Sequence, residues 1–148
     1  MRIMVDTNIL ISALMFPSPR MDTLFHKITT EYQLVLSSYV VDELLNVAHR
    51  KFEKKIEAVD VFLNQLLYEL VYTPEHSKPG LFDIRDEKDY PVLYSAMTES
   101  VDVFITGDRN FDELEVEKPE IISPAAFREK YLTSFVCVKM LPIKNIGI

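Results

Sequence analysis

A stretch near the start of the chain decides the fold: RIMVDTNILISALMFPSP, residues 2–19. Residues 2–5 form a short run of the kind found in strands, and the carboxylate of Asp6 ends it. Apolar side chains then recur with helical spacing over residues 8–15, until two prolines in residues 16–19 break the pattern. The stretch therefore predicts a strand that ends in a carboxylate and leads into a helix.

The rest of the chain continues this alternation of strand and helix. We expect strands at residues 33–36, 71–72, 101–106 and 121–122, and helices at residues 21–30, 39–51, 54–70, 89–100 and 124–131. The helix at residues 54–70 has the clearest apolar stripe. Repeated strand and helix predict an α/β fold, a single three-layer domain in which a parallel sheet is flanked by helices.

Length and composition limit the class of protein. The chain has 148 residues, 48% of them hydrophobic and 26% charged, which fits one domain that can bury a core without disulfides. Cys137 is the only cysteine, so the chain can form neither an internal disulfide nor a zinc site built from several thiolates. A reducing compartment suits such a chain.

Charge and hydropathy address partners and location. The net charge of -7 argues against broad electrostatic adhesion to nucleic acid or membrane, although a local nucleic-acid site is compatible with it. Asp6 interrupts the apolar run of residues 1–14, which is not typical of a signal peptide, and the other apolar runs are too short to span a bilayer. We therefore expect a cytoplasmic protein with no membrane contact.

Two carboxylates stand where a parallel sheet usually has its functional crevice, outside the carboxyl ends of the strands, and a third stands at the start of a helix. Asp6 and Asp108 each close a predicted strand, and Asp89 follows a long loop at residues 73–88, a kind of loop that usually has a function. Each also has a simpler interpretation. Asp6 and Asp108 suit caps or turns, and Asp89 suits a helix cap with Pro91 in the first turn.

Four motifs, in this order and at this spacing, resemble those of PIN-domain ribonucleases, and most closely the branch of toxins from toxin-antitoxin systems. They are VDTNILISAL (5–14), LSS (36–38) leading to DEL (42–44), RDEKD (85–89) and VFITGDRNF (103–111). The likeness covers about residues 2–131. It implies a PIN-like nuclease domain at residues 1–131 and a tail at residues 132–148, which is an added edge strand, a partner contact or a disordered end.

The resemblance implies four acids that bind metal and catalyse cleavage: Asp6, Glu43, Asp89 and Asp108. In that family the acids hold Mg²⁺ or Mn²⁺, and such hard cations prefer oxygen ligands and stabilise the oxygens of a phosphoryl displacement. Without metal, converging carboxylates repel one another and raise their own pKa values. A helical wheel by itself puts Glu43 on a solvated face, so only the resemblance selects it over Asp42.

Auxiliary polar residues are expected beside these acids: Asn8, Asp86, Asn110 and Asp112. Asn8, or Thr7 in its place, is a polar helper next to the first acid. Many relatives carry another acid where this chain has Asn110, so a second metal is expected to bind weakly unless Asp112 compensates. Asp86 is either an outer acid of the site or a loop residue.

Five basic residues are candidates for holding RNA phosphates: Arg50, Lys51, Arg85, Lys88 and Arg109. The last three neighbour the proposed acids. Arg50 and Lys51 belong to a cluster between two predicted helices, for which a solvated face paired with nearby glutamates is the alternative. Phosphate contacts position a strand without reading its sequence.

The resemblance implies a metal-dependent endoribonuclease with an RNA substrate, a small antitoxin protein as partner, and a homodimer. The alternative is a catalytically inactive PIN-like scaffold that binds RNA or protein. Two other classes with acids at strand ends fit less well. A phosphatase of the haloacid-dehalogenase type needs an Asp where Asn8 stands, and a receiver domain needs paired acids after its first strand, where only Asp6 is present.

Overall fold

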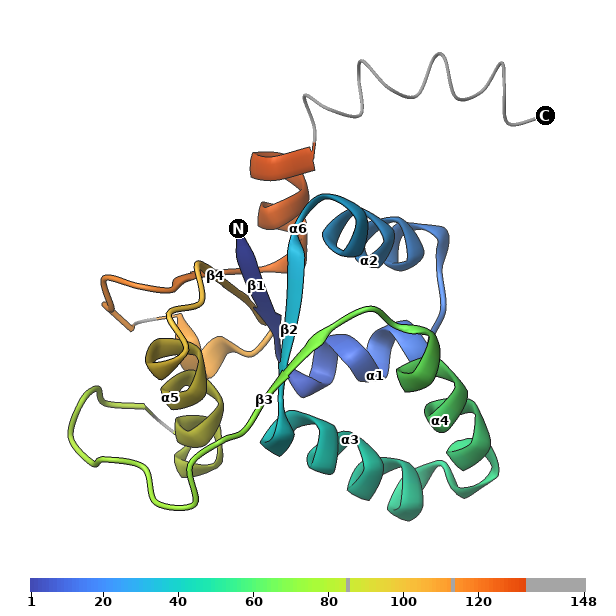
Figure 1. Cartoon of the computed structure of the whole chain (residues 1–148), viewed down its shortest axis with the longest axis horizontal. Helices are drawn as coiled ribbons and strands as arrows, with labels where there is room; N and C mark the ends of the chain where they lie inside the picture. The colour runs from blue at the N-terminus through green and yellow to red at the C-terminus, as the bar shows by residue number, and fades with distance from the viewer. Residues whose placement is uncertain (85, 113, 133–148) are drawn as a thin grey trace.

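A computed structural model describes residues 1–84, 86–112 and 114–132. Its centre is a five-stranded, all-parallel sheet in the order β3-β2-β1-β4-β5 (Figure 1). The strands are β1 (Arg2–Val5), β2 (Gln33–Ser37), β3 (Glu69–Val71), β4 (Val103–Ile105) and β5 (Glu120–Ile122). The predicted α/β fold with a parallel sheet is confirmed.

Helices connect and cover these strands. The α-helices are α1 (Thr7–Met15), α2 (Pro19–Glu31), α3 (Ser38–Lys51), α4 (Ile56–Gln65), α5 (Tyr90–Thr98) and α6 (Pro124–Phe127). The short 3₁₀ helices are η1 (Glu53–Lys55), η2 (Glu87–Asp89) and η3 (Arg109–Phe111), and a π-helical turn, η4 (Arg128–Leu132), follows α6. None of the helices in this part of the chain has the length and apolar character needed to cross a membrane.

Local sequence explains where several helices begin. Ser18 caps α2 by accepting a hydrogen bond from the N–H of Met21 at 3.2 Å, and Pro19 occupies the first turn. Ser37 caps α3 in the same way, accepting from the N–H of Val40 at 3.2 Å. The break at residues 16–19 therefore ends one helix and begins the next.

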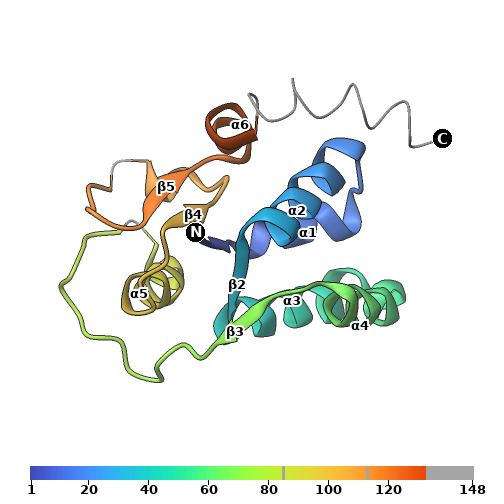
Figure 2. The ribbon, with the colours of Figure 1, turned by 45° about the horizontal axis from the view of Figure 1, so that its top comes forward.

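The direction of the connections divides the helices between the two faces of the sheet. The helices α1 to α4 lie on the path from β1 outward to β2 and β3, whereas α5 lies on the return path from β3 across to β4. Because parallel crossovers are right-handed, α1 to α4 cover one face and α5 the other (Figures 1 and 2). The strand order reverses between β1 and β4, so the crevice is expected at their carboxyl ends.

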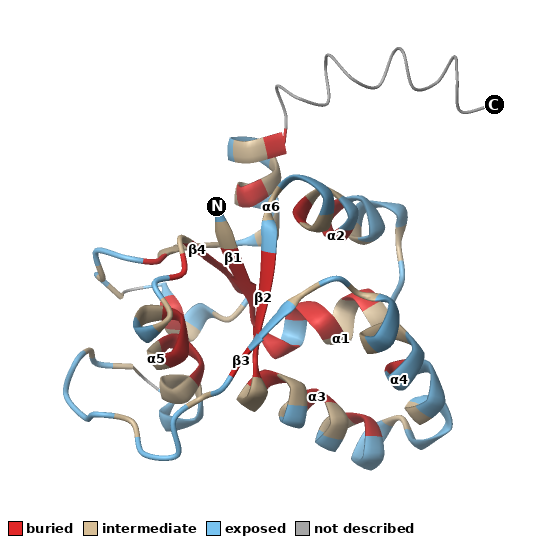
Figure 3. Cartoon of the chain, in the orientation of Figure 1, coloured by how far each residue is buried: buried red, intermediate tan, exposed pale blue. Residues whose placement is uncertain are grey.

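The core lies along the central strands, which are the most deeply buried part of the chain (Figure 3). Ile3, Met4 and Val5 of β1 are fully buried, and so are Phe104 of β4 and Phe127 of α6. Such side chains stabilise the fold by about 1.5–3 kcal/mol each relative to an exposed position. The rigid centre of the sheet fixes the strand ends from which the candidate site is built.

The helix predicted at residues 54–70 is wrong in its last turn and at its start. The structure has η1 before α4, and α4 ends at Gln65 because Leu66 takes an extended backbone (ψ 127°). Leu70 then pairs with Leu36 of β2, and Val71 pairs with Ser37. Sheet pairing replaces the final helical turn although the apolar spacing continues. β3 therefore comes earlier than the strand predicted at residues 71–72.

Other predicted boundaries shift by a few residues. The strand expected at residues 101–106 is limited to β4, and the helix expected at residues 124–131 divides into α6 and η4. The helix expected at residues 89–100 begins one residue later and ends at Thr98. The proposed tail lies outside the described residues, apart from Leu132.

Candidate active site

Asp6 directly follows β1, at the point where the strand order of the sheet reverses. Its N–H donates to the carbonyl of Ile105 at 3.1 Å, which holds the end of β1 against β4. One carboxylate oxygen accepts from the N–H of Thr7 at 2.7 Å, and the other accepts from the hydroxyl of Thr106 at 2.9 Å. Asp6 is only 4% exposed. It is therefore both the cap of α1 and a fixed acid of the crevice.

Thr106 joins two of the predicted acids. Its buried hydroxyl donates to Asp6 and accepts from the N–H of Asp108 at 3.0 Å. Asp108 caps η3 by accepting from the N–H of Asn110 at 2.9 Å. Sequence analysis missed Thr106, because Thr-Gly-Asp is an ordinary turn. The available signal is its place one residue after β4, opposite the residue that follows β1.

Asp89 contacts Asn110 and does not cap α5. It has no capping hydrogen bond, and its Oδ2 accepts from the side-chain amide of Asn110 at 3.0 Å. Asp86 supplies the local cap, accepting from the N–H of Lys88 at 3.0 Å at the start of η2. Asp89 therefore occupies the predicted position at the start of α5, with Pro91 in the first turn, but its carboxylate accepts from a residue of η3 and not from the helix.

Glu43 lies on the side of α3 that faces α1. It is half-buried and accepts a hydrogen bond from the hydroxyl of Thr7, whereas Asp42 beside it is exposed. The solvated face that a helical wheel assigns to Glu43 is wrong, because a wheel takes no account of the neighbouring helix. Thr7, given as an alternative to Asn8 for the polar helper, is the buried residue of the two, and Asn8 is exposed.

Two of the acids, Asp6 and Asp89, have raised pKa values. Burial raises the pKa of Asp6, hydrogen bonds from Thr106 and Thr7 oppose this, and the charges of Glu43 and Asp108 raise it further. The pKa of Asp89 rises to about 6, mainly through burial and also through the charges of Asp108, Asp6 and Asp86. Carboxylates from β1, α3, η2 and η3 therefore share one electrostatic environment.

Tyr39, in the first turn of α3, belongs to the same environment and was missed by sequence analysis. Burial raises the pKa of its hydroxyl, and the charges of Glu43, Asp89, Asp86 and Asp6 add to that effect. Its spacing of four residues from Glu43 places both on one side of the helix, which is the signal the sequence offers.

The chemistry of these acids fits a hard divalent cation. The donors are carboxylate oxygens, and a cation would relieve the repulsion that raises their pKa values. Within residues 1–84, 86–112 and 114–132, however, no three Asp, Glu, His or Cys side chains are arranged so as to hold a metal ion. Each acid is directed toward a neutral donor on Thr7, Thr106 or Asn110, or on the backbone. These neutral donors hold the carboxylates in the orientations that the structure shows.

The predicted basic residues fall into two groups. Lys88 and Arg109 are exposed. Lys88 directly precedes Asp89, and Arg109 directly follows Asp108. Arg50 and Lys51 are exposed at the far end of α3, seven and eight residues beyond Glu43, a rise of roughly 10–12 Å along the helix. Arg85 lies outside the described residues.

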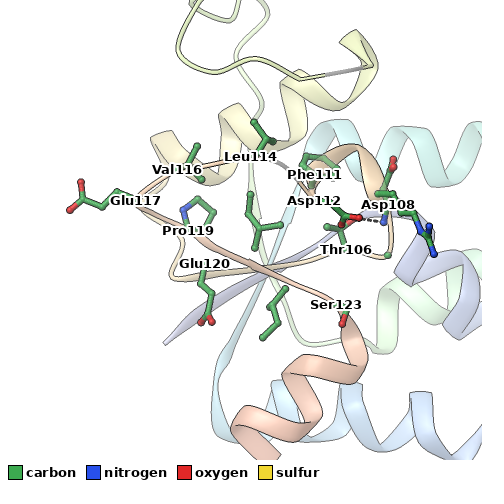
Figure 4. Close-up of a pocket in the computed structure, with 14 residues that line it drawn as sticks. Thr106, Asp108, Phe111, Asp112, Leu114, Val116, Glu117, Pro119, Glu120 and Ser123 are labelled. Atoms are coloured by element: carbon green, nitrogen blue, oxygen red, sulfur yellow. Dashed lines mark hydrogen bonds between the residues drawn. The ribbon is translucent and has the colours of Figure 1, made fainter.

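A cavity of about 570 Å³ opens beside Asp108 (Figure 4). Thr106, Asp108 and the exposed Asp112 line one side of it, and Leu114 and Pro119 line another. The side chains of Glu117 and Glu120 point away from the hollow (Figure 4). The cavity therefore extends the crevice from the acids along the ends of β4 and β5.

A family model described as PIN domain matches residues 2–110. The chain belongs to the PIN domain family. The matched residues include all four acids, Asp6, Glu43, Asp89 and Asp108. PIN domains are generally nucleases, so membership supports hydrolase activity for this PIN domain.

The fold is also similar to a solved structure. It is a chain in the crystal structure of VapBC2 from Rickettsia felis bound to a DNA fragment from the VapBC2 promoter. That chain superposes on the present one with a TM-score of 0.64 and 17% sequence identity. The alignment covers 82% of the present chain and 97% of that one. At this identity the likeness shows the fold. No curated protein gives a significant sequence match.

Proposed function

We propose that this PIN domain is an endoribonuclease that hydrolyses RNA phosphodiesters with Mg²⁺ or Mn²⁺. The observation that carries the proposal is the meeting of Asp6, Glu43, Asp89 and Asp108 at the reversal of strand order, with the pKa values of Asp6 and Asp89 raised by burial and by neighbouring negative charge. Acids that stabilised the fold would be expected to have cationic partners and lowered pKa values.

The residues of the chain have separate roles in this proposal. A bound divalent cation would polarise the phosphoryl oxygens and lower the pKa of attacking water. Asp6, Glu43, Asp89 and Asp108 would hold it. Thr7, Thr106 and Asn110 orient three of the acids through the hydrogen bonds described above. They are positioning residues, because they act through the acids.

The remaining polar residues of the crevice are assigned to the substrate or to the outer part of the site. Lys88 and Arg109 lie closest to the acids and would hold phosphates next to the cleaved bond, with Arg85 beside them in the sequence. Arg50 and Lys51 would contact the strand further away. Asn8, Asp86 and Asp112, exposed at the rim, would complete the auxiliary set with Asn110.

A cleavage assay on single-stranded RNA tests the proposal. The wild-type chain should cut in the presence of Mn²⁺ or Mg²⁺ and stop when a chelator is added. Asp6→Asn should be inactive but folded, because the amide keeps the shape of the carboxylate and an acceptor oxygen for the N–H of Thr7, and turns its NH2 group to the hydroxyl of Thr106, but loses the negative charge. RNA binding without cleavage by the wild type, at every metal tried, would favour the inactive PIN-like scaffold.

We also propose that this nuclease is the toxin of a toxin-antitoxin pair. The similarity in fold to VapBC2, a complex bound to a fragment of its promoter, supports this partner class. A small antitoxin would cover the crevice with an amphipathic helix and direct a basic side chain at the acids. The net charge of -7 suits a basic partner.

Expression and purification from the native host test the pairing. Growth arrest on expression without the partner, and recovery of a bound small protein, are the expected results. Recovery without any bound protein and without growth arrest would contradict the toxin assignment and leave the nuclease assignment intact. Sizing at several concentrations tests the proposed homodimer, in which the tail at residues 132–148 would extend the interface of the nuclease domain at residues 1–131.

A further inference from the structure

A second cavity, of about 250 Å³, lies on the other side of the acids from the one in Figure 4. Its walls come from the start of α3, from the chain that follows β3 and from the first turn of α5. The residues that the argument uses are Ser38, Tyr39, Asp42, Thr73, Glu75 and Pro91. We refer to it as the Tyr39 cavity.

A hydrogen-bond network centred on Thr73 fixes the walls of the Tyr39 cavity. The N–H of Thr73 donates to the hydroxyl of Ser38 at 2.9 Å, and the N–H of Tyr39 donates to the hydroxyl of Thr73 at 3.4 Å. The fully buried Ser95 donates to the same hydroxyl at 2.9 Å. These bonds join α3, the chain after β3 and α5, so the cavity is formed before any ligand binds.

The Tyr39 cavity adjoins the acids. Tyr39 lines it and stands one helical turn before Glu43, and Pro91 lines it and stands two residues after Asp89. The carboxylates of Glu43, Asp89, Asp86 and Asp6 all act on the hydroxyl of Tyr39. A strand whose phosphate lies at the acids would therefore bring a neighbouring nucleotide to this cavity.

The chemistry of the walls selects which part of a nucleotide enters. Asp42 and Glu75 are exposed carboxylates at the cavity, and none of the described residues that line it is a Lys or Arg, so a phosphate would be repelled. Tyr39 offers an aromatic face, on which unpaired bases stack. Carboxylates accept hydrogen bonds from exocyclic amino groups, as they do from the N4 of cytosine.

We propose that the Tyr39 cavity binds one unpaired nucleobase that carries an exocyclic amino group, with Tyr39 and Asp42 as specificity-determining residues. The inference rests on the proposed ribonuclease function and adds a substrate preference to it. Tyr39 would stack on the base, and the carboxylate of Asp42 would accept from its amino group. A base without that group would leave the carboxylate unpaired.

Binding of matched oligoribonucleotides tests the proposal without a change in the cavity. The inactive Asp108→Asn variant is titrated with short oligomers of adenosine and with the same oligomers built from purine riboside, which lacks only the amino group. We expect purine riboside oligomers to bind about tenfold more weakly, as loss of a hydrogen bond to a charged group predicts. Equal affinities, or no binding of either oligomer, would overturn the proposal.

Variants of the cavity provide the second test. Asp42→Ala, which removes the acceptor, should abolish the discrimination between the two oligomers, and Tyr39→Ala should weaken binding of both by about tenfold, whereas Tyr39→Phe keeps the aromatic face and most of the affinity. Phe16→Ala, at an aromatic residue that is 68% exposed beyond the end of α1, is the matched control. Full discrimination in Asp42→Ala would contradict the assignment.

Cleavage by the wild type separates this proposal from the function on which it rests. Cleavage with equal use of adenosine and purine riboside oligomers would overturn the base preference and leave the nuclease intact. Selective binding of adenosine oligomers without cleavage would overturn the nuclease and support the cavity.

Discussion

At the amino end of the sheet the acidic side chains have cationic partners, whereas at the carboxyl end they accept hydrogen bonds from neutral donors and lie within the reach of one another's charge. Asp102, just before β4, accepts from the N–H of Arg2 at 2.7 Å and pairs with Lys118 at 3.2 Å. Glu120, the first residue of β5, pairs with Lys130 at 2.5 Å. These hydrogen bonds and charges lower the pKa values of Asp102 and Glu120.

At the carboxyl end of the sheet, the acidic residues of the site have no such partners in the described part of the chain, and the effect on the pKa values of two of them is the opposite. None of the four ion pairs found among the described residues includes Asp6, Glu43, Asp89 or Asp108. The pKa values of Asp6 and Asp89 are raised. In one sheet, then, the paired acids stabilise the fold, and the unpaired acids make the metal-free fold less stable. Unpaired acids that converge are more simply explained by a cation that the folded chain binds.

Among the measurements proposed, the rate of RNA cleavage should differ most between variants at the two ends of the sheet. Asp89→Asn and Asp108→Asn should lower the rate of RNA cleavage by at least about a hundredfold, the size of loss seen when a single electrostatic catalytic group is removed. Asp102→Asn at the amino end should stay within about twofold of wild type. Initial rates at equal protein concentration measure this. Activity in both carboxyl-end variants would show that these acids do not catalyse the reaction.

Metal binding should stabilise the chain only through the carboxyl end. A cation that binds the folded state at a hundred times its Kd adds about 2.7 kcal/mol, which for a chain of this size raises the Tm by roughly 5–10 °C. Melting curves with and without Mn²⁺ should show this shift in wild type and in Asp102→Asn. The shift should vanish in Asp108→Asn. An equal shift in all three proteins would place the metal elsewhere.

The two ends should respond to pH with opposite sign. The pKa of Asp89 rises on folding from 3.8 to about 6, so its contribution to stability is complete below pH 3.8 and is lost as the pH rises through 6. Asp102 and Glu120 have lowered pKa values, so their contributions are present above their ordinary values of 3.8 and 4.5 and are lost as the pH falls below them.

The metal-free chain should therefore be most stable between pH 3.8 and pH 4.5, the ordinary pKa values of Asp89 and Glu120, and should lose stability as the pH rises from there to about 6, the raised pKa of Asp89. Urea unfolding at a series of pH values, at low protein concentration, measures the curve. Mn²⁺ should reduce this decline, because the cation neutralises the charges that cause it. A decline between pH 4.5 and pH 6 that Asp89→Asn leaves unchanged would contradict this cause.

Replacing one acid by its amide should have the smallest of these effects, a change in the free energy of unfolding. The sign of that change should again differ between the two ends of the sheet. Asp102→Asn should lower the free energy of unfolding by roughly 0.5–1.5 kcal/mol, because it weakens the hydrogen bond from Arg2 and removes the pairing with Lys118. Asp108→Asn keeps an oxygen for the cap of η3 and removes a repulsive charge. The free energy of unfolding of the metal-free chain should therefore not fall. Urea melts of both variants at pH 7 decide between these signs.

The strand ends and caps could be predicted because their signals are local. Asp6 follows a run of apolar residues, and Ser37 precedes a helical stripe, so the residues themselves indicate a boundary. The last turn of the helix predicted at residues 54–70 could not be excluded in this way. Its apolar spacing continues, and only pairing with β2 converts the segment to β3.

The sequence by itself determined the parallel α/β fold and the two acids that close β1 and β4, because strand length, helical period and strand-end position are properties of neighbouring residues. The tertiary structure decided which side of α3 Glu43 occupies, that Asp89 contacts Asn110, and that Thr106 joins Asp6 to Asp108. It also decided that Tyr39 adjoins the acids. The hydrogen bonds of Glu43, Asp89 and Asp6 join residues 21 to 100 positions apart. The packing of helices against the sheet, which no local pattern specifies, brings these residues together.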